Sequence, residues 1–222
     1  MAAVLQAAEW EIAVRSLGRV DYENTWRAMR DFTAARDVTT LDELWLLEHP
    51  PVYTMGLKGH ARAPTTLHNI SVVRTDRGGD MTYHGPGQLV VYLLLDLARL
   101  GLGVKGLVGL LEQAVIDLLA DDSVTAQRRS GAPGVYVNDR KIAALGLRVR
   151  GGRSYHGLAL NVDMDLAPFA HIDPCGTPGL GVTQLAELGV KADMASVRRQ
   201  LLERLLNRLG YNRHSFLSAP KS

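Results

Sequence analysis

The spacing of apolar and polar positions predicts a chain that mixes strands with helices. Residues 10–18 alternate as a strand does, and Asp21 follows as a helix N-cap ahead of Tyr22, Trp26 and Met29 at helical spacing. Further strands are predicted within 44–56, ending at Pro50-Pro51, at 71–75 and at 89–97, with a loop over 76–88. Apolar stripes predict helices at 107–118, 182–188 and 194–209, the last with Gly210 as its stop.

A β-meander is predicted between the helices expected at 107–118 and 182–188. The runs GVYV (134–137), KIAALGLRVR (141–150) and SYHGLALNVD (154–163) are separated by the turns Asn138-Asp139 and Gly151-Gly152. Strands and helices do not alternate strictly, so we expect an α+β fold with mixed or antiparallel β-sheets flanked by helices. No linker, repeat or low-complexity segment divides the sequence, which predicts one domain over residues 1–222 with a loose tail from about residue 212.

Composition narrows the class of protein without identifying a function. The chain has 222 residues, 46% of them hydrophobic and 22% charged, which suits a folded core and argues against disorder. A net charge of +2 is too small to indicate nucleic-acid binding, and no apolar run is long enough to span a membrane. A single cysteine excludes an internal disulfide and, without a signal-peptide pattern, predicts a cytoplasmic protein. The seven histidines show no metal-ligand spacing, so no metal is expected.

The only cysteine lies in the run AHIDPCGTPG, residues 170–179. A free cysteine is usually a buried structural residue, but Pro174 and Gly176 predict a turn, and turns lie at surfaces or clefts. At its ordinary pKa of about 8.5, only about 3% of a thiol is thiolate at pH 7, so a nucleophilic Cys175 requires a nearby cation or base. Lys141 is a candidate, since it begins an apolar strand, although a lysine beside a hairpin turn is often simply solvated.

Two glycine-rich runs were weighed as ligand sites. The run RGGDMTYHGPGQ (77–88) allows close backbone approach and offers donors from Arg77, Thr82 and His84, but a connection between strands would look the same. The run GLGVKG (101–106) matches G-x-G-x-x-G, but the acidic residues that follow it precede the next strand instead of ending it. We interpret the second run as a flexible turn before a helix.

Together and in this order, the segments resemble the lipoyl(octanoyl) transferases. The resemblance rests on RGGDMTYHGPGQ, on KIAALGLRVR with SYHGLALNV, on the PCG turn and on EHPPVYTMG upstream, and it covers about residues 42–184. It implies a fold similar to the catalytic domain of lipoate and biotin protein ligases, and an enzyme without a cofactor. The implied donor is octanoyl-acyl carrier protein. The implied acceptors are lysines on the lipoyl domains of 2-oxoacid dehydrogenase E2 subunits and on the glycine cleavage H protein.

The resemblance also implies roles for single residues. Cys175 would be the nucleophile that forms an acyl thioester, and Lys141 would lower the pKa of that thiol and act as general acid and base. The implied substrate-binding residues form three short runs: Arg77, Gly78, Gly79, Asp80, Met81, Thr82, Tyr83 and His84; Ala144, Leu145 and Gly146; and Gly157, Leu158 and Ala159.

The meander predicts how the acyl chain would be held. A two-residue turn at Gly151-Gly152 pairs Gly146 with Gly157 and Ala144 with Ala159, so four small residues would lie on one face of the sheet. They would form a slot for the chain or, alternatively, let a helix pack closely there. The same alternation turns Lys141 to the opposite face, and a bulge or a strand end must redirect it if it acts on Cys175.

Three other functions are compatible with these residues. They are an ATP-dependent lipoate or biotin ligase, a non-enzymatic module that binds an acyl carrier, and a cysteine hydrolase that pairs Cys175 with His84 or His156.

Overall fold

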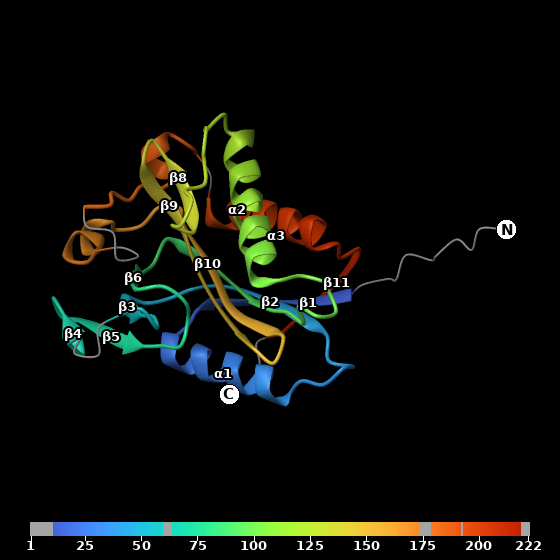
Figure 1. Ribbon diagram of the computed structural model, residues 1–222. Coiled ribbons are helices and arrows are strands. Elements are labelled where there is room, and N and C mark those ends of the chain that lie inside the picture. The colour runs from blue at the N-terminus through green and yellow to red at the C-terminus, as the bar shows by residue number, and fades with distance from the viewer. Residues whose placement is uncertain (1–10, 60–63, 174–178, 192, 219–222) are drawn as a thin grey trace.

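A seven-stranded mixed sheet forms the centre of the computed structural model, which describes residues 11–59, 64–173, 179–191 and 193–218 (Figure 1). The strand order is β11-β1-β2-β7-β10-β9-β8. β1 runs parallel to β2 and β11, and the other neighbouring pairs are antiparallel. The strands are β1 (Glu11–Arg19), β2 (Asp42–Glu48), β7 (Gln88–Leu94), β8 (Gly134–Val137), β9 (Arg140–Arg150), β10 (Arg153–Asn161) and β11 (Arg213–Leu217).

Helices cover both faces of this sheet (Figure 1). On one face α1 (Tyr22–Ala35) packs Met29 against Trp45 and Tyr92. On the other face, leucines of α2 (Val104–Asp121) and α3 (Met194–Leu209) pack together on the sheet to form the larger core. The predicted α+β class, with mixed sheets flanked by helices, is confirmed.

A smaller sheet lies beside one end of the large one. Its order is β4 (Thr66–Leu67), β5 (Ile70–Arg74), β3 (Val52–Met55), β6 (Met81–His84). Tyr53 and Tyr83 pack with Phe169 of the 3₁₀ helix η1 (Ala167–His171), and the Tyr53 hydroxyl donates to the Pro168 carbonyl at 2.8 Å. This sheet therefore positions the residues on both sides of the loop 76–80.

Helix boundaries fall at the two predicted capping residues, Asp21 and Gly210, and at Asp193, which was not predicted. The Asp21 carboxylate accepts a hydrogen bond from the Asn24 N–H at 2.9 Å, and Asp193 caps α3 in the same way. Gly210 ends α3 at φ 80°, a left-handed conformation that glycine adopts without strain. Within the described ranges, no helix has the length and apolar character needed to cross a membrane.

Three expected local structures are wrong. The segment 76–88 is not all loop, because Met81–His84 pairs with β3 as strand β6. The tail is not loose from residue 212, because Arg213–Leu217 supplies the hydrogen-bonding partner that the outer edge of β1 would otherwise lack. The helix expected at 182–188 is only the 3₁₀ turn η3 (Ala186–Leu188), since Thr183 before it bonds to Lys141 instead.

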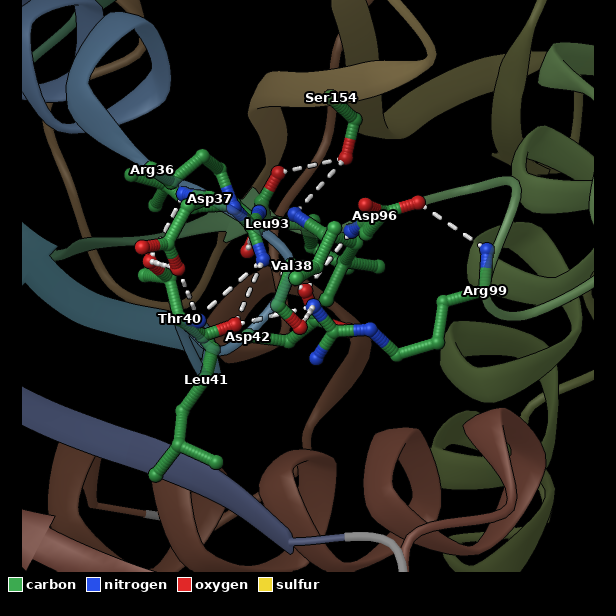
Figure 2. A network of polar contacts seen from close by, with 12 residues as sticks. Arg36, Asp37, Val38, Thr40, Leu41, Asp42, Leu93, Asp96, Arg99 and Ser154 are labelled. Carbon is green, nitrogen blue, oxygen red and sulfur yellow. Dashed lines mark hydrogen bonds and ion pairs between the residues drawn. The ribbon is translucent and has the colours of Figure 1, made fainter.

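A buried polar network closes the end of the sheet far from η1 (Figure 2). Arg36 and Asp42 form an ion pair with both side chains 0% exposed. Arg36 also donates to the Leu94 carbonyl at 3.0 Å, and Asp42 accepts from the Asp96 N–H at 2.7 Å and from the Tyr211 hydroxyl. The network thus joins the end of α1 to β2, β7 and the segment after α3.

Candidate active site

An inner pocket opens between the loop 76–80, α1 and the strands β7, β9 and β10. Its volume is about 40 Å³. The Gly78 N–H donates to the Leu147 carbonyl at 2.9 Å. This bond attaches the loop to the part of β9 that extends past the residues paired with β8. Most of the predicted binding residues line this pocket, namely Arg77, Gly79, Asp80, Thr82, His84, Ala144, Leu145, Gly146, Gly157, Leu158 and Ala159.

Three predicted binding residues lie outside the inner pocket. Gly78 packs on β9, Tyr83 belongs to the small core around Tyr53, and Met81 lines a second space. This outer cleft has a volume of about 360 Å³. It is lined by Met55, Pro64, Leu67, Asp80, Met81, His171, Ile172 and Asp173. Because Asp80 lines both spaces, the outer cleft and the inner pocket adjoin.

Arg77 braces the loop from inside. It is only 7% exposed, and its guanidinium donates to the Thr54 hydroxyl at 3.1 Å and to the Gly78 carbonyl at 3.0 Å. These bonds hold the loop against β3 while its positive charge stays close to the pocket.

A chain of hydrogen bonds connects His84 to the backbone of Lys141. The His84 Nδ1–H donates to Gln88 at 2.7 Å, Gln88 donates to Asn161 at 2.9 Å, and Asn161 donates to the Thr183 carbonyl at 2.9 Å. The Thr183 N–H then donates to the Lys141 carbonyl at 3.0 Å. Burial lowers the pKa of His84 to about 3, so the ring is neutral at pH 7.

His156 is held from the side by Asp76. Its Nε2–H donates to the Asp76 carboxylate at 3.1 Å, and the same carboxylate accepts from Trp26 at 2.8 Å and from the Tyr155 hydroxyl. Burial lowers the pKa of His156, a shift that its bond to Asp76 opposes. Burial alone would raise the pKa of Asp76, but these three hydrogen bonds outweigh it and hold the pKa below its usual value.

Lys141 is buried at 3% exposure instead of being solvated beside the turn. Its Nζ donates to the Pro133 carbonyl at 3.2 Å and lies 5.2 Å from the centre of the Tyr136 ring. The register between β8 and β9 shifts here, so that Val135 faces Ala143 while Tyr136 faces Lys141. The irregularity required to redirect Lys141 is therefore present in β9.

Cys175 lies outside the described residues, within the gap from 174 to 178. The chain on either side of this gap is described. Asp173, before it, lines the outer cleft, and Gly181, after it, accepts a hydrogen bond from the Lys141 N–H at 2.9 Å. In the part of the chain that the structure describes, no three His, Cys, Asp or Glu side chains are grouped as metal ligands would be.

The predicted strand register of the slot is confirmed, but the predicted direction of Gly157 is wrong. Gly146 pairs with Gly157 and Ala144 with Ala159, as expected. A Cβ on Gly146 would meet the Arg77 Cδ and the Gly78 carbonyl, both at 3.1 Å, on the pocket side. A Cβ on Gly157 would instead lie 2.0 Å from the Val91 carbonyl oxygen of β7, so this glycine allows two strands to pair and does not open the slot.

Comparison with known proteins identifies the family. The chain matches the family described as "Lipoyl protein ligase A/B catalytic domain" over residues 21–206. It is 60% identical over 194 residues to the octanoyltransferase of Aromatoleum aromaticum, covering 87% of this chain and 84% of that one. The octanoyltransferase of Thiobacillus denitrificans is 59% identical, with 87% and 89% covered. The chain belongs to the octanoyltransferase family. It is an acyltransferase.

Solved structures of related enzymes share the fold of this octanoyltransferase-family chain. A lipoate-protein ligase A bound with ATP superimposes with a TM-score of 0.72 at 15% identity, covering 96% of this chain and 90% of that one. The biotin protein ligase of Aquifex aeolicus, in complex with biotin and ATP, gives a TM-score of 0.55 at 16% identity, with 89% and 70% covered. At such identities the likeness concerns the fold alone, and it confirms the predicted similarity to lipoate and biotin ligases.

The sequence analysis missed four residues that line the octanoyltransferase pocket. Tyr22 fits the apolar stripe of helix α1, and Val90 and Tyr92 fit the apolar strand β7, so none of the three stood out as a site residue. His156 was considered only for a hydrolase. A signal for it was present in the sequence, because a histidine directly before a glycine in a strand allows a local irregularity.

Proposed function

We propose that this enzyme transfers an octanoyl group from octanoyl-acyl carrier protein to the ε-amine of a lysine on lipoyl domains, through a thioester on Cys175. The acceptors would be the lipoyl domains of 2-oxoacid dehydrogenase E2 subunits and the glycine cleavage H protein, in the cytoplasm. The observation that carries the proposal is the buried amine of Lys141, whose backbone bonds to the chain emerging from the Cys175 segment. Relatives up to 60% identical that are named octanoyltransferases support the same reaction.

In the first step, the Cys175 sulfur attacks the carbonyl carbon of the donor thioester. A C–S bond to the enzyme forms, the C–S bond to the carrier breaks, and the carrier leaves as a thiol. Lys141 accepts the proton of Cys175 and supplies one to the departing sulfur. A cation close to a thiol lowers the thiol pKa, which raises the fraction of the reactive thiolate.

In the second step, the neutral amine of the acceptor lysine attacks the acyl-enzyme. A C–N bond forms, the C–S bond to Cys175 breaks, and the proton lost by the amine returns to the cysteine through Lys141. The exchange between thioesters is nearly balanced and the conversion of a thioester to an amide is downhill, so the reaction requires no ATP.

The inner pocket lies along β9 from Lys141, in the direction in which an acyl chain would extend. Along β9 at about 3.3 Å per residue, Ala144–Gly146 lie about 10 to 16 Å from Lys141. An extended chain advances about 1.2 Å per bond, so the eight carbons of octanoate span about 8 to 9 Å. A carbonyl carbon near Lys141 would therefore place the chain end at the near edge of the pocket, about 8 to 9 Å along β9.

The intact mass of the enzyme after mixing with octanoyl-acyl carrier protein, without ATP, tests this proposal. We expect an octanoyl adduct on the wild type, none on Cys175→Ala, and loss of the adduct when a lipoyl domain is added. A requirement for ATP would favour a ligase, and release of octanoic acid without an acceptor would favour a hydrolase. Full transfer by a folded Cys175→Ala variant would overturn the thioester mechanism.

A further inference from the structure

A buried carboxylate on α2 takes no part in the steps described so far. Glu112 is only 6% exposed, in a helix whose leucines pack into the larger core. Its Oε1 accepts a hydrogen bond from the Gly134 N–H at 2.9 Å, and its Oε2 lies 3.2 Å from the Arg128 guanidinium. A buried carboxylate is unfavourable unless it is paired, and an apolar residue would otherwise suit this position. The partners of Glu112 therefore indicate its role.

The Gly134 N–H belongs to the same peptide unit as the Pro133 carbonyl. That carbonyl accepts the hydrogen bond from the Lys141 Nζ at 3.2 Å. A trans peptide is planar, and its N–H and C=O groups point in opposite directions. The carboxylate of Glu112 and the amine of Lys141 therefore bind the two sides of one rigid group. Hydrogen bonds in such a series strengthen one another, because a carboxylate that accepts from the N–H increases the negative charge on the carbonyl oxygen.

The same peptide unit is fixed by its other neighbours. The Tyr136 hydroxyl donates to the Ala132 carbonyl at 3.0 Å, which holds the residue before Pro133. A Cβ on Gly134 would lie 3.0 Å from the Lys141 Cε and 3.3 Å from its Nζ, so glycine is needed for the backbone to pass this close to the lysine. A movement of this peptide would therefore also move the amine of Lys141.

We propose that Glu112 is a positioning residue for Lys141 and acts on it through the Pro133-Gly134 peptide. Its carboxylate holds the peptide in place and makes the Pro133 carbonyl a stronger acceptor, which stabilises the protonated amine of Lys141. A more stable ammonium favours the transfer of the Cys175 proton to Lys141, so the thiolate forms at a lower pH. This inference rests on the proposed function, since it requires that Lys141 activates Cys175.

Alkylation of Cys175 by iodoacetamide, measured against pH, tests the inference, because the chain has one cysteine and its thiolate is the reactive form. Glu112→Leu removes the acceptor of the Gly134 N–H, so the midpoint of the alkylation rate should rise by about one pH unit, a tenfold loss of thiolate below the midpoint. Glu112→Gln keeps an acceptor oxygen, so its midpoint should stay within about 0.3 pH units of the wild type. An unchanged midpoint in Glu112→Leu, or an equal rise in Glu112→Gln, would overturn the inference.

Two further variants separate this role from a purely structural one. Arg128→Ala removes the ion pair of Glu112 but keeps its bond to Gly134, so the midpoint should match the wild type whatever happens to the Tm. A rise in Arg128→Ala equal to that in Glu112→Leu would overturn the assignment to the peptide.

Lys141→Ala distinguishes failure of the inference from failure of the proposed function. Its midpoint should rise at least as far as that of Glu112→Leu, because the whole amine is lost. If Lys141→Ala raises the midpoint and Glu112→Leu does not, the inference fails and the proposed function stands. If Lys141→Ala also leaves the midpoint unchanged, the role of Lys141 in the proposed function fails.

Discussion

Lys141 shows which contacts hold a buried charged residue at the start of β9. At 3% exposure, its ammonium donates to the Pro133 carbonyl at 3.2 Å and lies over the Tyr136 ring. A carbonyl and an aromatic face stabilise the charged form, yet neither takes up a proton. Both contacts hold the amine in place, and neither exchanges a proton with it.

Substitution of Lys141 separates charge from proton transfer. Lys141→Ala should slow the acylation of Cys175 by about 10²- to 10⁴-fold, the usual contribution of a general acid–base residue. Lys141→Arg should restore little of this, because arginine keeps the charge but does not release a proton at neutral pH. Single-turnover acylation followed by mass spectrometry gives these rates.

The adjacent Arg140 is the control for Lys141. It is exposed and bonds to Glu187 at 2.6 Å, so Arg140→Ala should acylate at close to the wild-type rate. If Lys141→Arg matched the wild type, the role of Lys141 would be purely electrostatic. If Lys141→Ala also matched it, Lys141 would have no role in the chemistry.

The two paired glycines of the meander should respond differently to a side chain. Gly146→Val places its side chain against Arg77 and the Gly78 carbonyl on the pocket side, so transfer should shift from octanoyl toward hexanoyl groups. Gly157→Ala forces a Cβ to 2.0 Å from the Val91 carbonyl, and overpacking of this kind destabilises by about 1–3 kcal/mol or more.

Melting temperatures and chain-length ratios distinguish these two effects. Gly157→Ala should lower the Tm by about 2 to 12 °C, at roughly 2–4 °C per kcal/mol for a chain of this size. Gly146→Val should change the hexanoyl-to-octanoyl ratio of kcat/KM more than it changes the Tm. An unchanged ratio in a stable Gly146→Val variant would show that this residue does not contact the chain.

At the level of elements, regular patterns were predictable and long-range pairings were not. The helices from Asp21 and to Gly210, and the meander around Gly151-Gly152, follow from local signals, which are caps, stripes and turns. Strand β11 was missed because Arg213–Leu217 has no apolar alternation, and its pairing with β1 involves residues some 200 positions away.

The candidate site shows the same division. The motif segments around Arg77, Ala144 and Gly157 carry sequence signals, and most of them meet in one pocket. The left-handed backbone of His156 and the direction of Gly157 depend on how β10 meets β7, which alternation alone does not specify. The pairing of the strands in the fold therefore determines the directions of His156 and Gly157, which the sequence pattern did not specify.

The network around Asp42 predicts where the elements are joined most firmly (Figure 2). Asp42→Ala would leave the Arg36 guanidinium buried without its carboxylate, and breaking a buried pair in this way destabilises by about 3–5 kcal/mol. The exposed pair of Arg27 and Glu23, at 3.0 Å within α1, is the control, and Glu23→Ala should change the free energy of unfolding by less than about 0.5 kcal/mol. Urea unfolding of both variants measures the difference, and similar losses would contradict this account.

At the scale of the whole molecule, three buried histidines lie in or beside the pocket: His84 and His156 line it, and the His49 ring lies 5.9 Å from that of His84. His49, His84 and His156 are 0%, 7% and 1% exposed. Burial lowers the pKa of His49 to about 4 and that of His84 to about 3, and it also lowers that of His156. The folded protein therefore holds these rings neutral under conditions in which the unfolded chain takes up protons.

The direction of the resulting pH dependence follows from this difference. An unfolded histidine has a pKa of about 6.5, so below that pH the unfolded state binds more protons than the native state, and stability falls as the pH falls. Each ring contributes up to about 1.4 kcal/mol per pH unit until its folded pKa is reached. We expect the free energy of unfolding from urea titrations to decline steadily from pH 7 to pH 5, where the native His49 and His84 rings are still neutral.

Substitution of His49 tests the origin of this slope. His49 donates to the Val20 carbonyl at 2.7 Å and accepts from Tyr92, and His49→Gln keeps both kinds of polar group without titrating. Its unfolding free energy should therefore decline less steeply between pH 7 and pH 5 than that of the wild type. The exposed His68 serves as the control, and His68→Gln should keep the wild-type slope. A wild-type slope in His49→Gln would mean that His49 is protonated alike in the folded and unfolded states, which its burial between Val20 and Tyr92 argues against.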